Sequence, residues 1–135
     1  MIEVGGPEWT RSIAIVSTLE SATPPRLSEV APDLANELTE VLDSMGEGLL
    51  AASIVALRIH AVDACGDDFC SSFYVGPKPL GGWRREGDYR CVPLVVATGM
   101  VNLDVVDESI RFVEVIDRPD VEVKIAPIRG RPRTS

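Results

Sequence analysis

The chain has 135 residues, of which 45% are hydrophobic and 25% are charged, the proportions of an ordinary globular protein. Its 21 acidic and 13 basic residues give a formal net charge of −8, which argues against a general nucleic-acid or acidic-membrane binder, because phosphate affinity needs clustered Lys and Arg. No apolar run approaches the roughly 20 residues of a membrane span, and the N-terminus lacks the order of a signal peptide, so we expect a cytoplasmic protein.

The length predicts a single domain with a short segment at each end. The first 26 residues are expected to form an N-terminal extension or an edge element, because Ile13 and Ile15 alternate with small residues before a Thr-Pro-Pro stop. Residues 27–126 are expected to form one α+β domain. Residues 127–135 are expected to be a disordered basic tail.

The segment from Pro32 to Met45 has the clearest helical pattern. Its apolar residues recur at intervals of three and four, which places them on one face of a helix: Leu34, Leu38, Val41, Leu42 and Met45. Pro32 suits the first turn and Gly46 suits the end. The residues from Leu49 to Ser53 can add a further helical turn.

Alternating or β-rich segments predict strands over Ile54–Val62, Phe69–Val75 and Cys91–Val96. The intervening segment Gly76–Arg90 is rich in Pro and Gly and predicts a long loop, the kind of segment where function is often found. The residues from Pro119 onward also alternate, but a proline suits the first turn of a helix, and we expect a short helix there.

The segment from Gly99 to Asp117 predicts a β-hairpin on which the rest of the fold is arranged. A two-residue loop at Asp107-Glu108 sets three cross-strand pairs: Val105 with Ile110, Leu103 with Phe112, and Asp104 with Arg111. Glu108 is an unusual residue for such a loop, where Gly is preferred. Past Phe112 the residues are apolar on both faces, which indicates either a bulge or a strand end covered on both sides.

Together these elements predict an α+β fold, an antiparallel β-meander of four to five strands with one long helix packed on one face. An open sheet of this kind has exposed edges, and a second copy of the chain could cover one of them to form a homodimer. Burial of the doubly apolar strand end by the C-terminal segment is an equally good alternative.

Four side chains with metal-ligand chemistry occur in the middle of the chain: His60, Cys65, Cys70 and Cys91. Their spacing lacks the paired Cys motifs of zinc sites, and an odd number of cysteines favours reduced thiols. In the alternative interpretation Cys70 and Cys91 are small buried residues and Cys65 lies in a turn. A Cys65–Cys70 disulfide is a further alternative.

An aromatic and basic cluster lies within the expected long loop: Trp83, Arg84, Arg85 and Tyr89, with Arg90 beside it. Mixtures of Trp, Tyr and Arg are typical of the residues that dominate protein interfaces. The cluster is positive in an acidic chain, so it could recognise an acidic peptide or a carboxylate. Alternatively, Trp83 folds back on the sheet and the arginines are simply solvated.

Three stretches carry a specific pattern: Cys65-Gly-Asp-Asp-Phe-Cys70-Ser-Ser-Phe-Tyr74, Gly99-Met100 with Leu103-Asp-Val-Val-Asp107, and Val113-Glu-Val-Ile-Asp-Arg-Pro119. They resemble a group of small uncharacterised bacterial proteins, over about Ile54 to Pro119. This chain departs from the group at Asp63, where a further Cys is common, and at Glu108, where Gly is usual. The resemblance implies a stand-alone α+β fold and assigns no functional residues.

The chain lacks a recognisable catalytic constellation, and nothing basic lies near Cys65 to lower the pKa of its thiol. We therefore expect a small cytoplasmic bacterial protein without catalysis or cofactor that binds another protein, as an immunity or antitoxin module does. The alternative is a metal- or redox-responsive thiol protein that uses Cys65, Cys70 and Cys91, with His60 as a further ligand.

Overall fold

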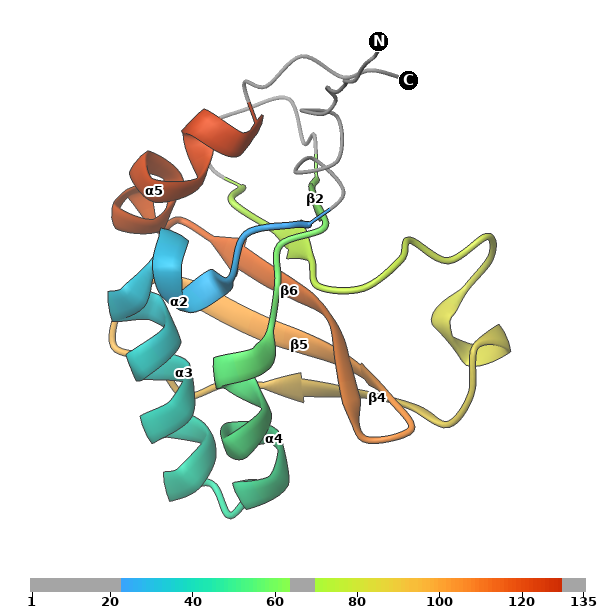
Figure 1. The fold of residues 1–135 in the computed structure, drawn as a ribbon. Coiled ribbons are helices and arrows are strands. Elements are labelled where there is room, and N and C mark those ends of the chain that lie inside the picture. The colour runs from blue at the N-terminus through green and yellow to red at the C-terminus, as the bar shows by residue number, and fades with distance from the viewer. Residues whose placement is uncertain (1–22, 64–69, 130–135) are drawn as a thin grey trace, which may run out of the picture.

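The computed structural model describes residues 23–63 and 70–129 (Figure 1). The strands are β2 (Ala61–Val62), β3 (Phe73–Tyr74), β4 (Tyr89–Pro93), β5 (Met100–Val106) and β6 (Ser109–Ile116). The α-helices are α2 (Leu27–Val30), α3 (Pro32–Ser44), α4 (Gly48–Ser53) and α5 (Pro119–Arg129), and the 3-10 turns are η2 (Ile54–Ala56) and η3 (Trp83–Arg85). The prediction of an α+β fold with an antiparallel sheet is confirmed, and within the described residues the sheet has five strands.

The strands are ordered β2-β3-β6-β5-β4 across the sheet, so the chain does not follow a simple meander. β4, β5 and β6 are sequential neighbours, but β3 pairs with β6 and not with β4. The segment between β3 and β4 therefore connects the interior of the sheet to its far edge. This connection is the long loop that the sequence predicts, and it projects from the body of the molecule in Figure 1.

Several helices cover one face of the sheet, in place of the one long helix that the sequence predicts (Figure 1). α3 occupies the predicted segment, and two backbone breaks separate it from its neighbours. Pro32 disfavours a helical conformation at Ala31, which has φ −138° and ψ 73°. Gly46 has φ +80°, a left-handed conformation that ends α3 before α4 begins.

The segment Ile54–Val62 is mostly not a strand. α4 continues into η2 at Ile54, and Val55 is 63% exposed, so the apparent alternation there does not reflect a sheet face. The chain becomes extended at Leu57, and only Ala61 and Val62 form β2. β3 is likewise shorter than the segment Phe69–Val75, whereas β4 begins two residues before the expected Cys91.

The β5–β6 hairpin contains a bulge at Arg111. Val105 pairs with Ile110 as predicted, but Asp104 pairs with Phe112 and Leu103 with Val113, so two of the three predicted pairs are wrong. The extra residue turns Phe112 to the face away from the helices and returns Val113 and Val115 to the core. The bulge explains the broken alternation. It lies at Arg111, one residue before Phe112, whereas the sequence shows the break only past Phe112.

The hairpin turn has two residues, as predicted, although neither is Gly. Asp107 has φ +52° and Glu108 has φ +62°, which is the conformation of a type I′ turn. Both side chains compensate for this unfavourable backbone. The Asp107 carboxylate accepts the N–H of Asp88 at 2.9 Å, and the Glu108 carboxylate binds Arg90 at 2.7 Å.

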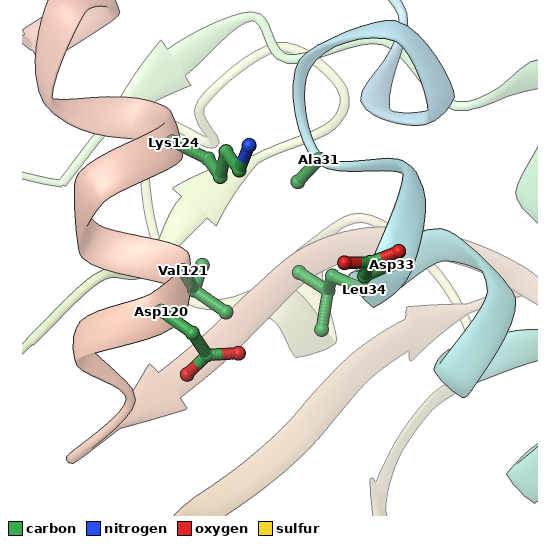
Figure 2. A pocket seen from close by; sticks show the side chains of 6 residues that line it. All are labelled: Ala31, Asp33, Leu34, Asp120, Val121 and Lys124. Carbon is green, nitrogen blue, oxygen red and sulfur yellow. The ribbon is translucent and has the colours of Figure 1, made fainter.

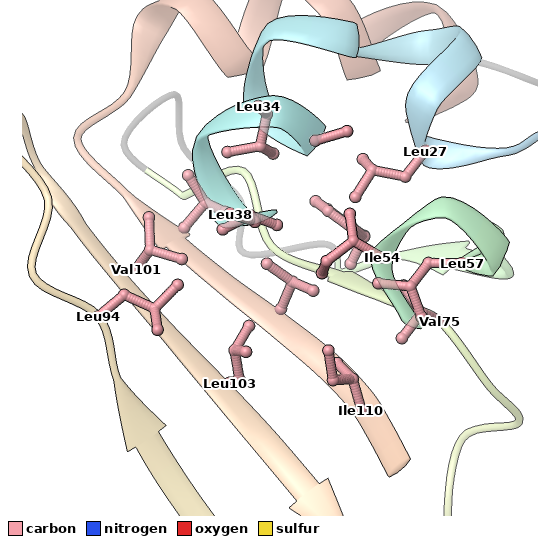
Figure 3. Close-up of a cluster of buried hydrophobic side chains, with 14 of the residues drawn as sticks. Leu27, Leu34, Leu38, Ile54, Leu57, Val75, Leu94, Val101, Leu103 and Ile110 are labelled. Carbon is pink, nitrogen blue, oxygen red and sulfur yellow. The ribbon is translucent and has the colours of Figure 1, made fainter. Parts of the chain in front are cut away.

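The core lies between the helices and the sheet (Figure 3). Helical residues such as Leu34, Leu38 and Ile54 meet strand residues such as Val101 and Leu103, and all five are at least 98% buried. Burial of this many aliphatic side chains is the main favourable term in folding. The apolar stripe of α3 therefore packs against the apolar face of the sheet in one interface.

Arg118 fixes α5 against the rest of the fold. Its side chain is 6% exposed and donates to Glu37 of α3 at 2.7 Å and to Asp120 at 3.0 Å. The hydrogen bond from Arg118 lowers the pKa of the Asp120 carboxyl. α5 confirms the expected C-terminal helix and extends to Arg129, beyond the expected start of the tail at residue 127. Residues 130–135, like the expected N-terminal segment up to residue 22, lie outside the described part.

Candidate functional site

Two of the proposed metal ligands, His60 and Cys91, lie at opposite edges of the sheet. Cys91 begins a row of registered residues that crosses all five strands: Cys91, Asp104, Phe112, Tyr74 and Ala61. His60 adjoins the far end of this row, and four strand spacings of about 4.8 Å place the two edges about 19 Å apart. Cys65 lies outside the described residues. Among residues 23–63 and 70–129, no group of three or more His, Cys, Asp or Glu could hold a metal ion.

The two described cysteines are in different states. Cys70 is 8% exposed and disulfide-bonded. Cys91 is an exposed free thiol on β4, so it is not the small buried residue of the alternative interpretation. Desolvation, with the nearby Asp104 and Glu114 carboxylates, raises the pKa of the Cys91 thiol, which makes it a weak nucleophile at neutral pH.

The long loop places Trp83 against an aromatic group on the sheet face opposite the helices. Trp83 is half-buried in η3, and its ring centroid lies 6.2 Å from that of Tyr74. Tyr74 in turn contacts Phe112 at 4.5 Å, and Lys78 Nζ lies 5.7 Å from the Tyr74 ring centroid. The aromatic contacts fix the base of the loop on the sheet, in agreement with the interpretation that Trp83 folds back.

Tyr89 is the first residue of β4 and directly follows the loop. Its hydroxyl donates to Asp104 Oδ1 at 2.8 Å, and this hydrogen bond raises the pKa of Tyr89 to about 12. The Arg84 guanidinium carbon lies 5.4 Å from the centre of the Tyr89 ring. A neutral, fixed phenol ring thus supports one of the loop arginines by a cation–π contact.

Arg84 and Arg85 are exposed, and neither forms an ion pair with a carboxylate in the described part of the chain. The Arg85 side chain lies over Gly81, where a Cβ atom would come within 2.9 Å of its Cδ. Within the described part of the chain, the Lys78 ammonium likewise contacts only the Tyr74 ring. The structure therefore places two cations over aromatic rings, Lys78 over Tyr74 and Arg84 over Tyr89, with Arg85 beside Gly81 in the same loop. We call this surface the basic–aromatic loop: Lys78, Trp83, Arg84, Arg85 and Tyr89.

Arg90 does not belong with this group, although it adjoins it in sequence. Its guanidinium donates two hydrogen bonds to Glu47 at 2.9 Å and two to Glu108 at 3.0 and 2.7 Å. The hydrogen bond from Arg90 lowers the pKa of Glu47. Arg90 therefore joins the loop before α4 to the hairpin turn. Sequence reasoning missed this role because both partners are distant in the chain and no local pattern marks them.

A small pocket of about 70 Å³ lies between α5 and the α2–α3 junction (Figure 2). Its polar lining residues are Asp33, Asp120 and Lys124, and its apolar ones are Ala31, Leu34 and Val121. Sites for organic ligands usually measure about 300–1,000 Å³, so this pocket is too small for one. Asp120 is also bound to Arg118, which leaves the basic–aromatic loop as the better candidate site.

The comparisons with known proteins assign no family. No protein-family model, no curated protein and no solved structure matches the chain. The resemblance to a group of small bacterial proteins stays a prediction. Within the described residues, none of the helices combines the length and the apolar character needed to cross a bilayer.

Proposed function

We propose that this chain is a small non-catalytic protein-binding module whose basic–aromatic loop contacts an acidic segment of another protein. One observation carries the proposal: Arg84 and Arg85 are exposed without carboxylate partners in the described residues, while Arg90 and Arg118 are each held by two. The chain as a whole carries a net charge of −8, so an unneutralised basic surface is a local exception. Such a surface favours encounter with an acidic partner.

The neighbouring aromatic residues support the same proposal. Trp83 is half-buried against Tyr74, and Tyr89 is fixed by Asp104, so the rings lose little conformational freedom when a partner binds. Half-buried aromatic side chains beside Arg are typical of interface hot spots. An immunity- or antitoxin-type role is one form that such a module can take.

The test compares affinity capture from the native lysate by the wild-type chain and by the Arg84→Glu/Arg85→Glu variant. We expect the wild-type chain to capture a specific acidic partner, and the variant to lose it, because the substitutions reverse the charge of the loop. Arg26→Glu/Lys124→Glu is the matched control, since both residues are exposed and lie outside the loop, and the change in net charge is the same. Equal capture by all three chains would contradict the proposal.

A thiol-redox role is the second candidate, and the disulfide bond of Cys70 favours it over a metal site. A cysteine in a disulfide does not supply a thiolate to a metal. Disulfides are rare in the cytosol, and those that occur there are usually redox-active. If the chain is cytoplasmic, as the sequence predicts, a redox role is therefore the expected role of this bond. Native protein prepared without reductant is expected to titrate fewer than three thiols. Three free thiols would exclude this second candidate.

A further inference from the structure

The helical layer of the fold is acidic throughout. The segment from Leu27 to Leu57, which forms α2, α3, α4 and η2, contains six carboxylates and no Lys, Arg or His. Glu37 and Glu47 are neutralised by arginines from outside this segment. Glu40 and Asp43 are exposed, and neither forms an ion pair within residues 23–63 and 70–129. The layer therefore presents uncompensated negative charge to the solvent.

Beside these carboxylates, α4 and η2 expose an apolar stripe. The residues that point away from the core recur at intervals of three and four: Leu49, Ala52, Val55 and Ala56. Leu49 is 79% exposed and Val55 is 63% exposed. The whole segment Gly48–Leu57 contains no charged residue. Single exposed apolar side chains are normal, but a contiguous row of them is typical of an interaction surface.

The acidic residues and the apolar stripe lie on one outer surface. α3 and α4 lie side by side on the same face of the sheet (Figure 1). Glu40 and Asp43 lie on the side of α3 opposite the buried Leu38 and Leu42, as the helical period requires. Since both helices bury their inner sides against the sheet, their exposed sides point the same way. We call this surface the helical face: Glu40, Asp43, Leu49, Ala52, Val55 and Ala56.

Charge and backbone chemistry indicate which occupant the helical face would accept. Carboxylates beside an apolar stripe complement a segment that is both apolar and basic. That segment is best satisfied as a helix, because the surface of a helix offers no strand edge to pair with, and a helix satisfies its own backbone groups. A second copy docked through the same face would instead bring two acidic layers together, each on a chain with a net charge of −8.

We propose that the helical face binds an amphipathic basic helix of a partner protein, with the apolar side of that helix on Leu49 and Val55 and its cations beside Glu40 and Asp43. This surface is distinct from the basic–aromatic loop and opposite to it in charge. The inference goes beyond the proposed function and does not depend on it.

The probe is a fluorescent peptide of about 18 residues, long enough for a helix, with Leu at intervals of three and four and Lys at the other positions. The charge control has Glu in place of every Lys. Fluorescence anisotropy measures binding at about 0.15 M salt, where screening beyond about 8 Å suppresses general attraction to an acidic chain. We expect saturable binding of the basic peptide and none of the acidic one.

The apolar stripe is tested with Leu49→Ala/Val55→Ala. Its matched control is Leu80→Ala/Val95→Ala, which truncates one exposed Leu and one exposed Val outside the helical layer. The first variant should weaken binding by about tenfold, because less apolar surface is buried, and the second by less than about twofold. Circular dichroism and thermal unfolding establish that the variants are folded.

The acidic residues are tested with Glu40→Lys/Asp43→Lys. Glu86→Lys/Asp88→Lys is its control, because these residues are exposed before β4, outside the helical layer, and the change in net charge is the same. The first variant should weaken binding by about tenfold or more, and the control by less than about twofold. In the wild-type chain, the peptide should gain helical circular dichroism and shift the amide resonances of Leu49 and Val55, results that need no variant.

The outcomes separate this inference from the proposed function. Arg84→Glu/Arg85→Glu should bind the basic peptide at least as well as the wild-type chain, whatever lysate capture shows. Equal weakening by test and control variants would show a general attraction to negative charge and overturn the inference, as would no binding at millimolar peptide. If sedimentation shows self-association that Leu49→Ala/Val55→Ala abolishes, a second copy occupies the helical face and the inference is overturned.

Discussion

At the scale of single residues, Arg90 and Arg118 have a structural role that Arg84 and Arg85 lack, although no sequence pattern distinguishes the two pairs. Arg90 and Arg118 each bind two carboxylates, of which Glu47 and Glu108 for Arg90 and Glu37 for Arg118 are distant in the chain and Asp120 is two residues from Arg118. Arg84 and Arg85 have no such partners in the described residues, and this contrast is the basis of the proposed function.

Replacing Arg118 with Ala should destabilise the fold by about 1–3 kcal/mol, because Glu37 and Asp120 lose a cation that is 94% buried (6% exposed). Urea unfolding measures the change. Arg26→Ala is the control and should lie within about 0.5 kcal/mol of the wild type, since Arg26 is exposed. Equal stability of the two variants would show that the Arg118 cluster contributes nothing.

The same variant should change the response to acid. The pKa of Asp120 is lowered in the folded state, so its contribution to stability is present above about pH 4 and is lost as the pH falls through the lowered value. Without Arg118 this contribution is absent. Unfolding midpoints measured between pH 5 and 2 should therefore fall less steeply for Arg118→Ala than for the wild-type chain.

The Tyr89 phenol should ionise only at an unusually high pH. Its hydrogen bond to Asp104 raises its pKa to about 12, so the proton stays bound in the folded state. The resulting stability is present below about pH 10 and is lost as the pH rises through the folded value. Ultraviolet titration should show Asp104→Asn moving one tyrosine toward pH 10. An unchanged titration curve would mean that the hydrogen bond does not control this phenol.

At the scale of elements, the bulge in β6 decides which residues reach the core. Arg111 is the extra residue, and on either side of it Ile110, Val113 and Val115 face the helices. A strand without the bulge would keep Phe112 on the core face beside Ile110 and turn Val113 and Val115 outward, since side chains alternate with a period of two. One inserted residue thus exchanges the faces of half the strand.

Deletion of Arg111 should therefore be tolerated, because every β5–β6 pair after it keeps its register. The Val75 N–H loses its bond to the Arg111 carbonyl at 3.0 Å, so we expect a cost of about 1 kcal/mol. Deletion of Glu114 is the contrasting variant, since it moves the fully buried Val115 to the other face. Thermal unfolding should show a cooperative transition for the first deletion and a far weaker one for the second.

At the scale of the whole molecule, the core joins helices of one segment to strands of another. Leu38 of α3 is fully buried in this interface. Leu38→Ala should cost about 2–5 kcal/mol, since the cavity cannot collapse completely. Leu49→Ala is the control, because Leu49 is 79% exposed and its truncation should have little effect. Denaturant unfolding of both variants tests whether this interface carries the stability of the fold.

The local patterns explain how much could be predicted. The stripe of Leu34, Leu38 and Leu42 defines α3, and the alternation from Val101 to Val105 defines β5, since each depends only on neighbours in the chain. The pattern at Val55 was misleading, because a short helix and a strand cannot be told apart by a few apolar residues. In the candidate site, the aromatic and basic composition was visible, but the partners of Arg90 were not.

The sequence by itself determined the class of fold, its main helix, the position of the hairpin and the location of the long loop, because these follow from periodicity and from Gly and Pro. Only the tertiary structure decided that β3 pairs with β6, that the extra residue of the hairpin is Arg111, and which arginines are neutralised. The physical reason is that strand order, bulges and ion pairs depend on contacts between distant segments.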